Sequence, residues 1–85
     1  MKWELRIEKS ARKQLDKIPA EYQKKISAVF PVIAADPYTG KKLDGKLTGL
    51  YSYQVRPYRI IYKIYKEVLV VIIIRVGHRQ GVYHK

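Results

Sequence analysis

The chain has no cysteine, few acidic residues and no long apolar run, and each absence excludes a class of protein. Without cysteine, neither disulfides nor thiolate metal ligands can stabilise its 85 residues. The longest apolar run, residues 68–74, is too short to cross a bilayer. The first residues also lack the apolar segment and cleavage site of a signal peptide. We therefore expect a cytoplasmic protein with a single domain over residues 1–85 and no membrane association.

Several catalytic groups are missing as well. None of the serines, Ser10, Ser27 and Ser52, lies in a nucleophile-elbow pattern. No glycine-rich stretch precedes Lys-Ser or Lys-Thr, as a phosphate-binding loop requires. Carboxylates are sparse near the two histidines, His78 and His84. The sequence therefore disfavours metal-dependent hydrolysis and nucleotide hydrolysis, and we expect no metal and no cofactor.

Positive charge is abundant. Eighteen Lys and Arg residues against seven Asp and Glu residues give a net charge of +11. Because self-repulsion at this level weakens the compact state, such a charge usually serves binding to a polyanion or to an acidic protein. A membrane surface would need a basic helix with an apolar face to spare, and so short a chain needs its apolar helical residues for the core. The composition is typical of a nucleic-acid-binding domain.

The first half of the chain predicts one strand and two helices. Apolar and polar residues alternate over residues 2–8, which indicates a half-buried strand. Apolar residues at helical spacing then predict a short helix over residues 10–18, with Ser10 as its N-cap. A second apolar stripe predicts a helix that ends near residue 36. Within it, we expect Pro31 to kink or break the helix.

The second half predicts a loop and three strands. Glycine and proline punctuate residues 37–49, which indicates a loop. Strands are predicted over residues 50–56, 58–65 and 69–76, and the last is apolar on both faces, as in a central strand. The order β-α-α-β-β-β predicts an α+β domain with a small, mostly antiparallel sheet and two N-terminal helices packed on one face. The other sheet face is left for function.

Cationic and hydrogen-bonding side chains cluster around the last strands. The predicted sheet brings together Arg56, Arg59, Arg75, His78, Arg79 and Tyr83. Arginine can hold phosphate oxygens and stabilise charge that develops on phosphorus, imidazole moves protons near neutral pH, and tyrosine stacks on unpaired bases. Each residue alone is more often an ordinary surface or packing residue, so the hypothesis depends on their proximity. The loop lysines Lys41, Lys42 and Lys46 are predicted to steer phosphates rather than to catalyse.

Three segments carry a resemblance to a known family. Residues 42–51 read Lys-Leu-Asp-Gly-Lys-Leu-Thr-Gly-Leu-Tyr, residues 58–62 read Tyr-Arg-Ile-Ile-Tyr, and residues 75–79 read Arg-Val-Gly-His-Arg, followed by Val82 and Tyr83. In this order and at this length, the chain resembles the RelE family of toxin ribonucleases, within the RelE/ParE superfamily, over essentially its whole length.

The resemblance implies the toxin of a type II toxin–antitoxin system, a metal-independent endoribonuclease that cleaves mRNA on the ribosome and so inhibits translation. In such a reaction the RNA 2′-hydroxyl attacks the adjacent phosphorus. By motif match, Arg59 and Arg79 would hold the scissile phosphate, and Tyr83 would orient a base or assist proton transfer. His78 would act as acid or base, or only add charge. An acidic antitoxin would compete with RNA for the same surface.

The chain departs from the family at two positions. Ser52 and Gln54 stand where the best-characterised members carry lysines, one of which is thought to help proton transfer. The departure leaves three alternatives: His78 takes that role, the enzyme is slow, or the chain is not a nuclease. Two other functions therefore compete with the first: a ParE-type toxin that inhibits DNA gyrase, and a basic RNA-binding module without catalysis.

Overall fold

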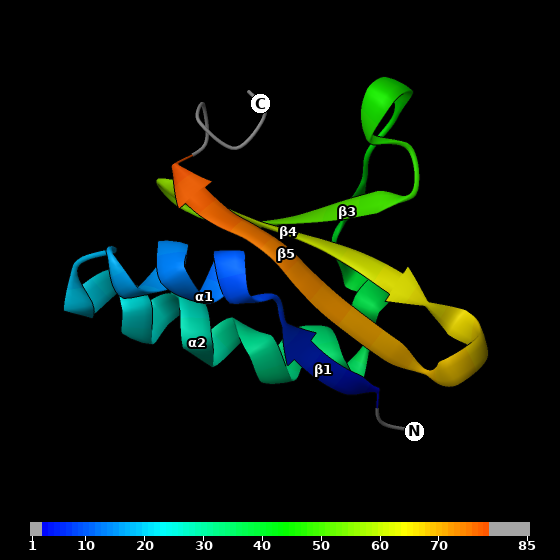
Figure 1. Cartoon of the computed structure of the whole chain (residues 1–85), viewed down its shortest axis with the longest axis horizontal. Coiled ribbons are helices and arrows are strands. Elements are labelled where there is room, and N and C mark those ends of the chain that lie inside the picture. Colours follow the sequence, from blue (N-terminus) through cyan, green and yellow to red (C-terminus); the bar gives the residue numbers. More distant parts are fainter. Residues whose placement is uncertain (1–2, 79–85) are drawn as a thin grey trace.

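A computed structural model describes residues 3–78 and shows two α-helices on one side of a five-stranded sheet (Figure 1). The elements are β1 (Glu4–Ile7), α1 (Lys9–Asp16), α2 (Ala20–Ala35), β2 (Lys41–Lys42), β3 (Leu50–Val55), β4 (Tyr58–Tyr65) and β5 (Val70–His78). The strand order is β1-β5-β4-β3-β2, with β1 parallel to β5 and the other pairs antiparallel. The predicted α+β class and the central place of the last strand are confirmed.

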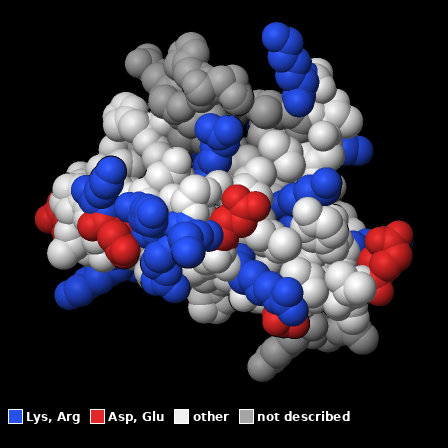
Figure 2. Space-filling view, in the orientation of Figure 1, with Lys and Arg blue, Asp and Glu red and all other residues white. Residues whose placement is uncertain are grey.

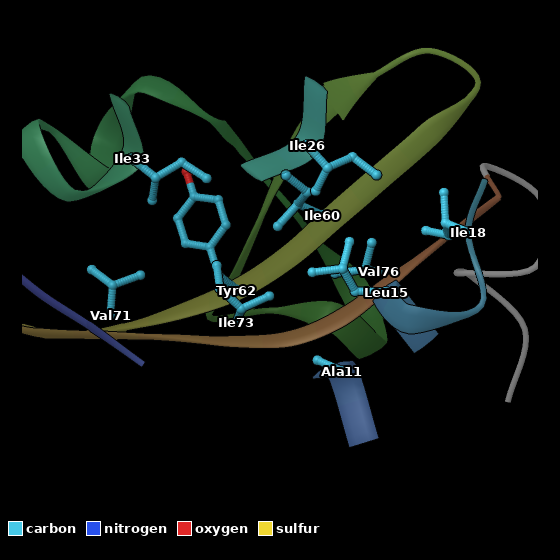
Figure 3. Packing of buried hydrophobic residues seen from close by; sticks show 10 residues of the cluster. All are labelled: Ala11, Leu15, Ile18, Ile26, Ile33, Ile60, Tyr62, Val71, Ile73 and Val76. Atoms are coloured by element: carbon cyan, nitrogen blue, oxygen red, sulfur yellow. The ribbon is translucent and has the colours of Figure 1, made fainter. Parts of the chain in front are cut away.

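The main core lies between the two helices and the sheet (Figure 3). Its fully or nearly fully buried members come from both layers: Ala11, Leu15, Ile18, Ile26, Ile33, Ile60, Tyr62, Val71, Ile73 and Val76. Burying each large apolar side chain contributes about 1.5–3 kcal/mol. The apolar stripes that predicted the helices are the faces that the helices bury.

The helices differ from the prediction at their ends and at the proline. Helix α1 begins at Lys9 with Glu8 as its N-cap residue, so Ser10 lies inside the first turn and the predicted cap is wrong. Helix α2 runs through Pro31 to Ala35, so the helix is not broken there. Pro31 is exposed, whereas Ile33, just beyond it, is fully buried. Packing on the far side of the proline therefore offsets the missing backbone hydrogen bond.

A bulge in β5 decides which side chains face away from the helices. Tyr62 pairs with Ile73 and Ile61 pairs with Arg75, so Ile74 has no partner across the strand pair. Because side chains alternate along a strand, an extra residue shifts the pattern by one. Arg75 therefore shares the open face of the sheet with Ile61, while the core residues before and after the bulge keep the helix-covered face.

The segment that was predicted as a loop, residues 37–49, contains a strand. Lys41 and Lys42 form β2, which pairs with β3 and makes the sheet edge. Just after it, Leu43 folds over the open face and forms a small second core with Ile61. Two adjacent lysines carry no local strand signal, so this pairing is set by contacts distant in sequence.

Candidate functional site

A shallow hollow of about 380 Å³ lies on the sheet between its edge strand and β4. Residues from β2, β3, β4 and the turn before β2 line it: Thr39, Gly40, Lys41, Ser52, Tyr53, Gln54 and Arg59. The hollow thus joins one residue that we predicted as catalytic, Arg59, to one predicted as RNA-binding, Lys41. It also contains both positions at which the chain departs from the RelE pattern, Ser52 and Gln54.

Arg59 is held in place by the strands around it. It lies on β4 opposite Gln54 of β3 on one side and Gly77 of β5 on the other. Its Nη1 donates a hydrogen bond of 3.4 Å to the Oγ atom of Ser52, a buried hydroxyl. Gly77 carries no side chain that could cover the guanidinium from that side. The planar guanidinium of this half-buried residue presents its donors in the geometry that phosphate oxygens accept.

Lys41 is positioned by an anchor beneath the sheet edge. The Tyr62 hydroxyl, fully buried, donates a 2.6 Å hydrogen bond to the Pro37 carbonyl oxygen. Gly40 packs so closely on this ring that a side chain there would overlap the Tyr62 hydroxyl. The close packing fixes the turn that leads into β2, in which Lys41 lies directly opposite Ser52 of β3. Side chains directly opposite share a sheet face, so Lys41 and Ser52 project on the same side.

The buried phenol of Tyr62 is uncharged at physiological pH. Burial raises the pKa of Tyr62 to about 12, although a backbone hydrogen bond from Gly40 acts in the opposite direction. Tyr62 therefore serves as a structural donor beneath the hollow and not as a proton carrier.

The other predicted cations lie outside this hollow. Arg75 borders a second hollow of about 340 Å³ together with Glu8, Ser10, Gln14 and Ile74. Arg56 is exposed in the turn between β3 and β4, and Lys42 and Lys46 are exposed in and after β2. None of these four residues lines the hollow with Arg59, and their predicted contacts with RNA stay predictions.

The end of β5 separates His78 from Arg59. The predicted strand stopped at Val76, but β5 continues through Gly77 to His78, which pairs with Tyr58. The His78 ring lies edge-on to the Tyr58 ring at 6.1 Å, and Tyr58 packs on the core of the helix-covered face. The His78 ring and the Arg59 side chain therefore lie on opposite faces. Arg79 and Tyr83 lie outside the described residues, and their roles stay predictions.

Sequence reasoning missed several residues of the hollow, namely Thr39, Gly40 and Tyr53. For Gly40, the sequence offered one sign of a special position: a glycine directly before two lysines. Its backbone angles, φ −77° and ψ 178°, are open to any residue, so its role is close packing and not an unusual conformation. Thr39 and Tyr53 offered no signal, because they border the hollow only through the pairing of β2 with β3.

On the face of the molecule shown in Figure 2, the positive charge is spread rather than gathered in one patch. Figure 2 shows Lys and Arg side chains over the helical layer and over the loops, with acidic residues between them. Such a distribution raises association rates with polyanions, but it does not by itself mark a site. No helix within residues 3–78 is long and apolar enough to span a membrane. In the same part of the chain, no three His, Asp or Glu side chains are grouped as metal ligands would be.

Both the sequence and the fold of this chain match known toxins. Residues 5–83 match the family model for the ParE toxin of the parDE type II toxin–antitoxin system. Toxin RelG of Mycobacterium tuberculosis is 31% identical over 87 residues, covering 100% of both chains. In the crystal structure of the toxin–antitoxin complex RelBE2 from M. tuberculosis, one chain superposes with a TM-score of 0.86 at 31% identity, covering 93% of this chain and 100% of that chain. A mutant of E. coli toxin RelE in the free state shares the fold, with a TM-score of 0.81 at 24% identity, covering 95% of this chain and 87% of that chain.

These matches define the class of protein. The chain belongs to the RelE/ParE superfamily and is a toxin of the type II toxin–antitoxin class. Within that class, the matching family model is that of the ParE toxin, whereas the curated relative is named Toxin RelG.

Proposed function

We propose that this toxin is a metal-independent endoribonuclease that cleaves mRNA, on the ribosome in the cytoplasm, and so inhibits translation. The observation that carries the proposal is the hollow on the open sheet face, in which the Arg59 guanidinium donates a hydrogen bond to the buried Ser52 hydroxyl. A phosphodiester backbone that entered the hollow would meet fixed cationic donors, and the net charge of +11 would speed its arrival.

The proposed reaction is a transesterification within the RNA. The 2′-oxygen forms a bond to the adjacent phosphorus and loses its proton, while the bond from phosphorus to the 5′-oxygen breaks and that oxygen gains a proton. The products are a 2′,3′-cyclic phosphate and a free 5′-hydroxyl. The phosphorane between them carries extra negative charge, which Arg59 would stabilise from within the hollow. Removing such a donor typically lowers the rate about 10²- to 10³-fold.

The proposed mechanism includes three further residues near the C-terminus: Arg79, His78 and Tyr83. Arg79 would hold the scissile phosphate with Arg59, and Tyr83 would orient the neighbouring base. Because the His78 ring lies on the face opposite to Arg59, we place charge stabilisation at the centre of the mechanism and keep proton transfer by His78 as a prediction.

We also propose an acidic antitoxin as the partner of this chain. Solved relatives include toxin–antitoxin complexes from M. tuberculosis and Pyrococcus horikoshii. A partner with clustered Asp and Glu residues would be attracted by the same positive charge that attracts RNA, and binding would weaken as salt rises.

Arg59→Ala tests the nuclease proposal. The assay is cleavage of end-labelled mRNA on programmed ribosomes, with analysis of the product ends. We expect the wild-type chain to leave cyclic phosphates and Arg59→Ala to lose about 10²-fold in rate. Lys63→Ala is the control, because Lys63 is an exposed cation on the same strand and the same sheet face but outside the hollow. Equal rates for Arg59→Ala and Lys63→Ala would refute the assignment.

One observation favours a second function, inhibition of DNA gyrase: the matching family model is that of ParE toxins. Induction of a gyrase toxin would leave mRNA intact and produce gyrase-linked DNA breaks. Primer extension on mRNA after brief induction, with a parallel assay for DNA breaks, separates the two functions. Tight RNA binding without cleavage would instead identify a non-catalytic RNA-binding module.

A further inference from the structure

We propose that Lys41, on the edge strand β2, is a catalytic residue that binds the scissile phosphate together with Arg59. This inference rests on the proposed nuclease function and gives Lys41 a role different from that of the other loop lysines, for which we predict only steering of phosphates. It follows from three features of the hollow: its lining, its strand register and its anchor.

The lining singles out Lys41 among the lysines of its segment. Lys41 and Arg59 are the cationic residues that line the hollow, and they lie on opposite sides of Ser52 and Gln54. Lys42, its neighbour in β2, pairs with Tyr51, whose side chain packs on the helix-covered core. Because side chains alternate along a strand, Lys42 projects away from the hollow.

The register brings the two cations within reach of one phosphate. Lys41 lies directly opposite Ser52, which places the Cβ atoms of the two residues about 5 Å apart. The Arg59 Nη1 atom is 3.4 Å from the Ser52 Oγ atom. The long side chain of Lys41 can therefore bring its ammonium group over Ser52, to the side of the hollow facing the guanidinium. Two cations that face each other across a small hydroxyl repel until an anion lies between them.

The anchor makes the position of Lys41 a property of the fold. The Pro37 carbonyl accepts the hydrogen bond from the buried Tyr62 hydroxyl, and Gly40 packs against that ring directly before Lys41. A surface lysine that only steers phosphates does not need such a fixed backbone. A residue that stabilises charge in a transition state needs one, because the rate enhancement depends on a charge that is already in position.

Single-turnover cleavage of end-labelled mRNA on programmed ribosomes tests the inference, with the same mRNA free of ribosomes in parallel. Lys41→Met keeps the length of the side chain and removes the charge. We expect it to lower the rate at saturating toxin about 100-fold, the lower end of what the loss of one transition-state donor costs. Lys42→Met should instead raise the toxin concentration needed for half-maximal rate by a few-fold, because it removes only a steering charge. Lys63→Met, outside the hollow, should match the wild type.

Moving the charge within the hollow provides a rescue. Gln54 is exposed, lines the same hollow and lies opposite Arg59 on β3. The double variant Lys41→Met/Gln54→Lys should recover at least about a third of the wild-type rate, a result that a purely structural role of Lys41 would not give. Thermal unfolding of each variant shows that the chain is folded, and Lys41→Arg should keep most of the activity because it keeps the charge.

The outcomes separate the two proposals. A wild-type chain that cleaves mRNA while Lys41→Met cleaves as fast as Lys63→Met would overturn the role of Lys41 alone. A change confined to half-saturation in Lys41→Met would also overturn it, because it would make Lys41 a steering residue. A wild-type chain that cleaves no mRNA in either format would overturn the proposed function and this inference with it.

Discussion

The close packing of Gly40 on Tyr62 leads to a prediction about stability. A Cβ atom added at Gly40 would lie 2.8 Å from the Ser52 carbonyl oxygen and 3.1 Å from Cζ of Tyr62, and closer still to the Tyr62 hydroxyl. The Tyr62 side chain is fully buried, so it can move aside only by disturbing the core around it. We therefore expect Gly40→Ala either to push β2 off the sheet edge or to displace the ring.

The cost has two parts. Overpacking a rigid site costs about 1–3 kcal/mol. Displacing the ring or the turn also weakens the 2.6 Å hydrogen bond from Tyr62 to Pro37, a loss of about 1 kcal/mol. The free energy of unfolding should therefore fall by about 2–4 kcal/mol. For a chain of this size, each kcal/mol lowers the melting temperature by about 4–8 °C.

Urea and thermal denaturation measure the effect, and a double-mutant cycle assigns it. Tyr62→Phe removes the atom nearest to the new methyl group, so the two changes together should cost less than their sum by about 1 kcal/mol. The Ser52 carbonyl oxygen remains close, so the double variant should still be less stable than Tyr62→Phe alone. Thr39→Ala, an exposed neighbour, is the control. Wild-type stability of Gly40→Ala, or simple additivity in the cycle, would refute the close packing.

Two further predictions concern alkaline pH and the edge of β5. Burial raises the pKa of Tyr62 to about 12 from its ordinary value of 10.0, so between these values the folded chain holds a proton that the unfolded chain has lost. Stability should therefore fall as the pH rises through this range, more steeply in the wild type than in Tyr62→Phe, and parallel urea midpoints would refute this. The Val76 N–H donates to Gln14 Oε1 at 2.9 Å, so Gln14→Leu should cost about 1 kcal/mol and speed amide exchange at Val76. Unchanged exchange there would contradict this role.

The sequence predicted the elements whose signals are local. Alternation and helical spacing gave β1, α1 and α2 to within a few residues, and the doubly apolar run was correctly placed inside the sheet. Strand β2 could not be found in this way. Two consecutive lysines have low strand propensity. Their pairing with β3 is supported by partners that lie far along the chain: Ile61, on which Leu43 packs, and Tyr62, which bonds to the Pro37 carbonyl before β2.

The candidate site was predicted in part, because proximity along the chain does not determine the face of a sheet. Arg59 lines the hollow, and its contact with phosphate stays a prediction. Arg75 reaches the open face only through the bulge at Ile74, and it then borders a different hollow. His78 follows the strand alternation onto the helix-covered face. A shift of one residue in register would exchange these faces, and no local pattern fixes that register.

The two lysines of β2 show how one short strand can meet two separate demands. An exposed sheet edge invites pairing with another chain, and charged side chains on the edge discourage it whichever face they project from. Edge protection can therefore be provided by Lys42 as well as by Lys41. Of these two lysines, Lys41 is the one that faces Ser52 and lines the hollow with Arg59. Aggregation and catalysis should for this reason respond differently to the loss of each lysine, and the strand register is the physical cause of the difference.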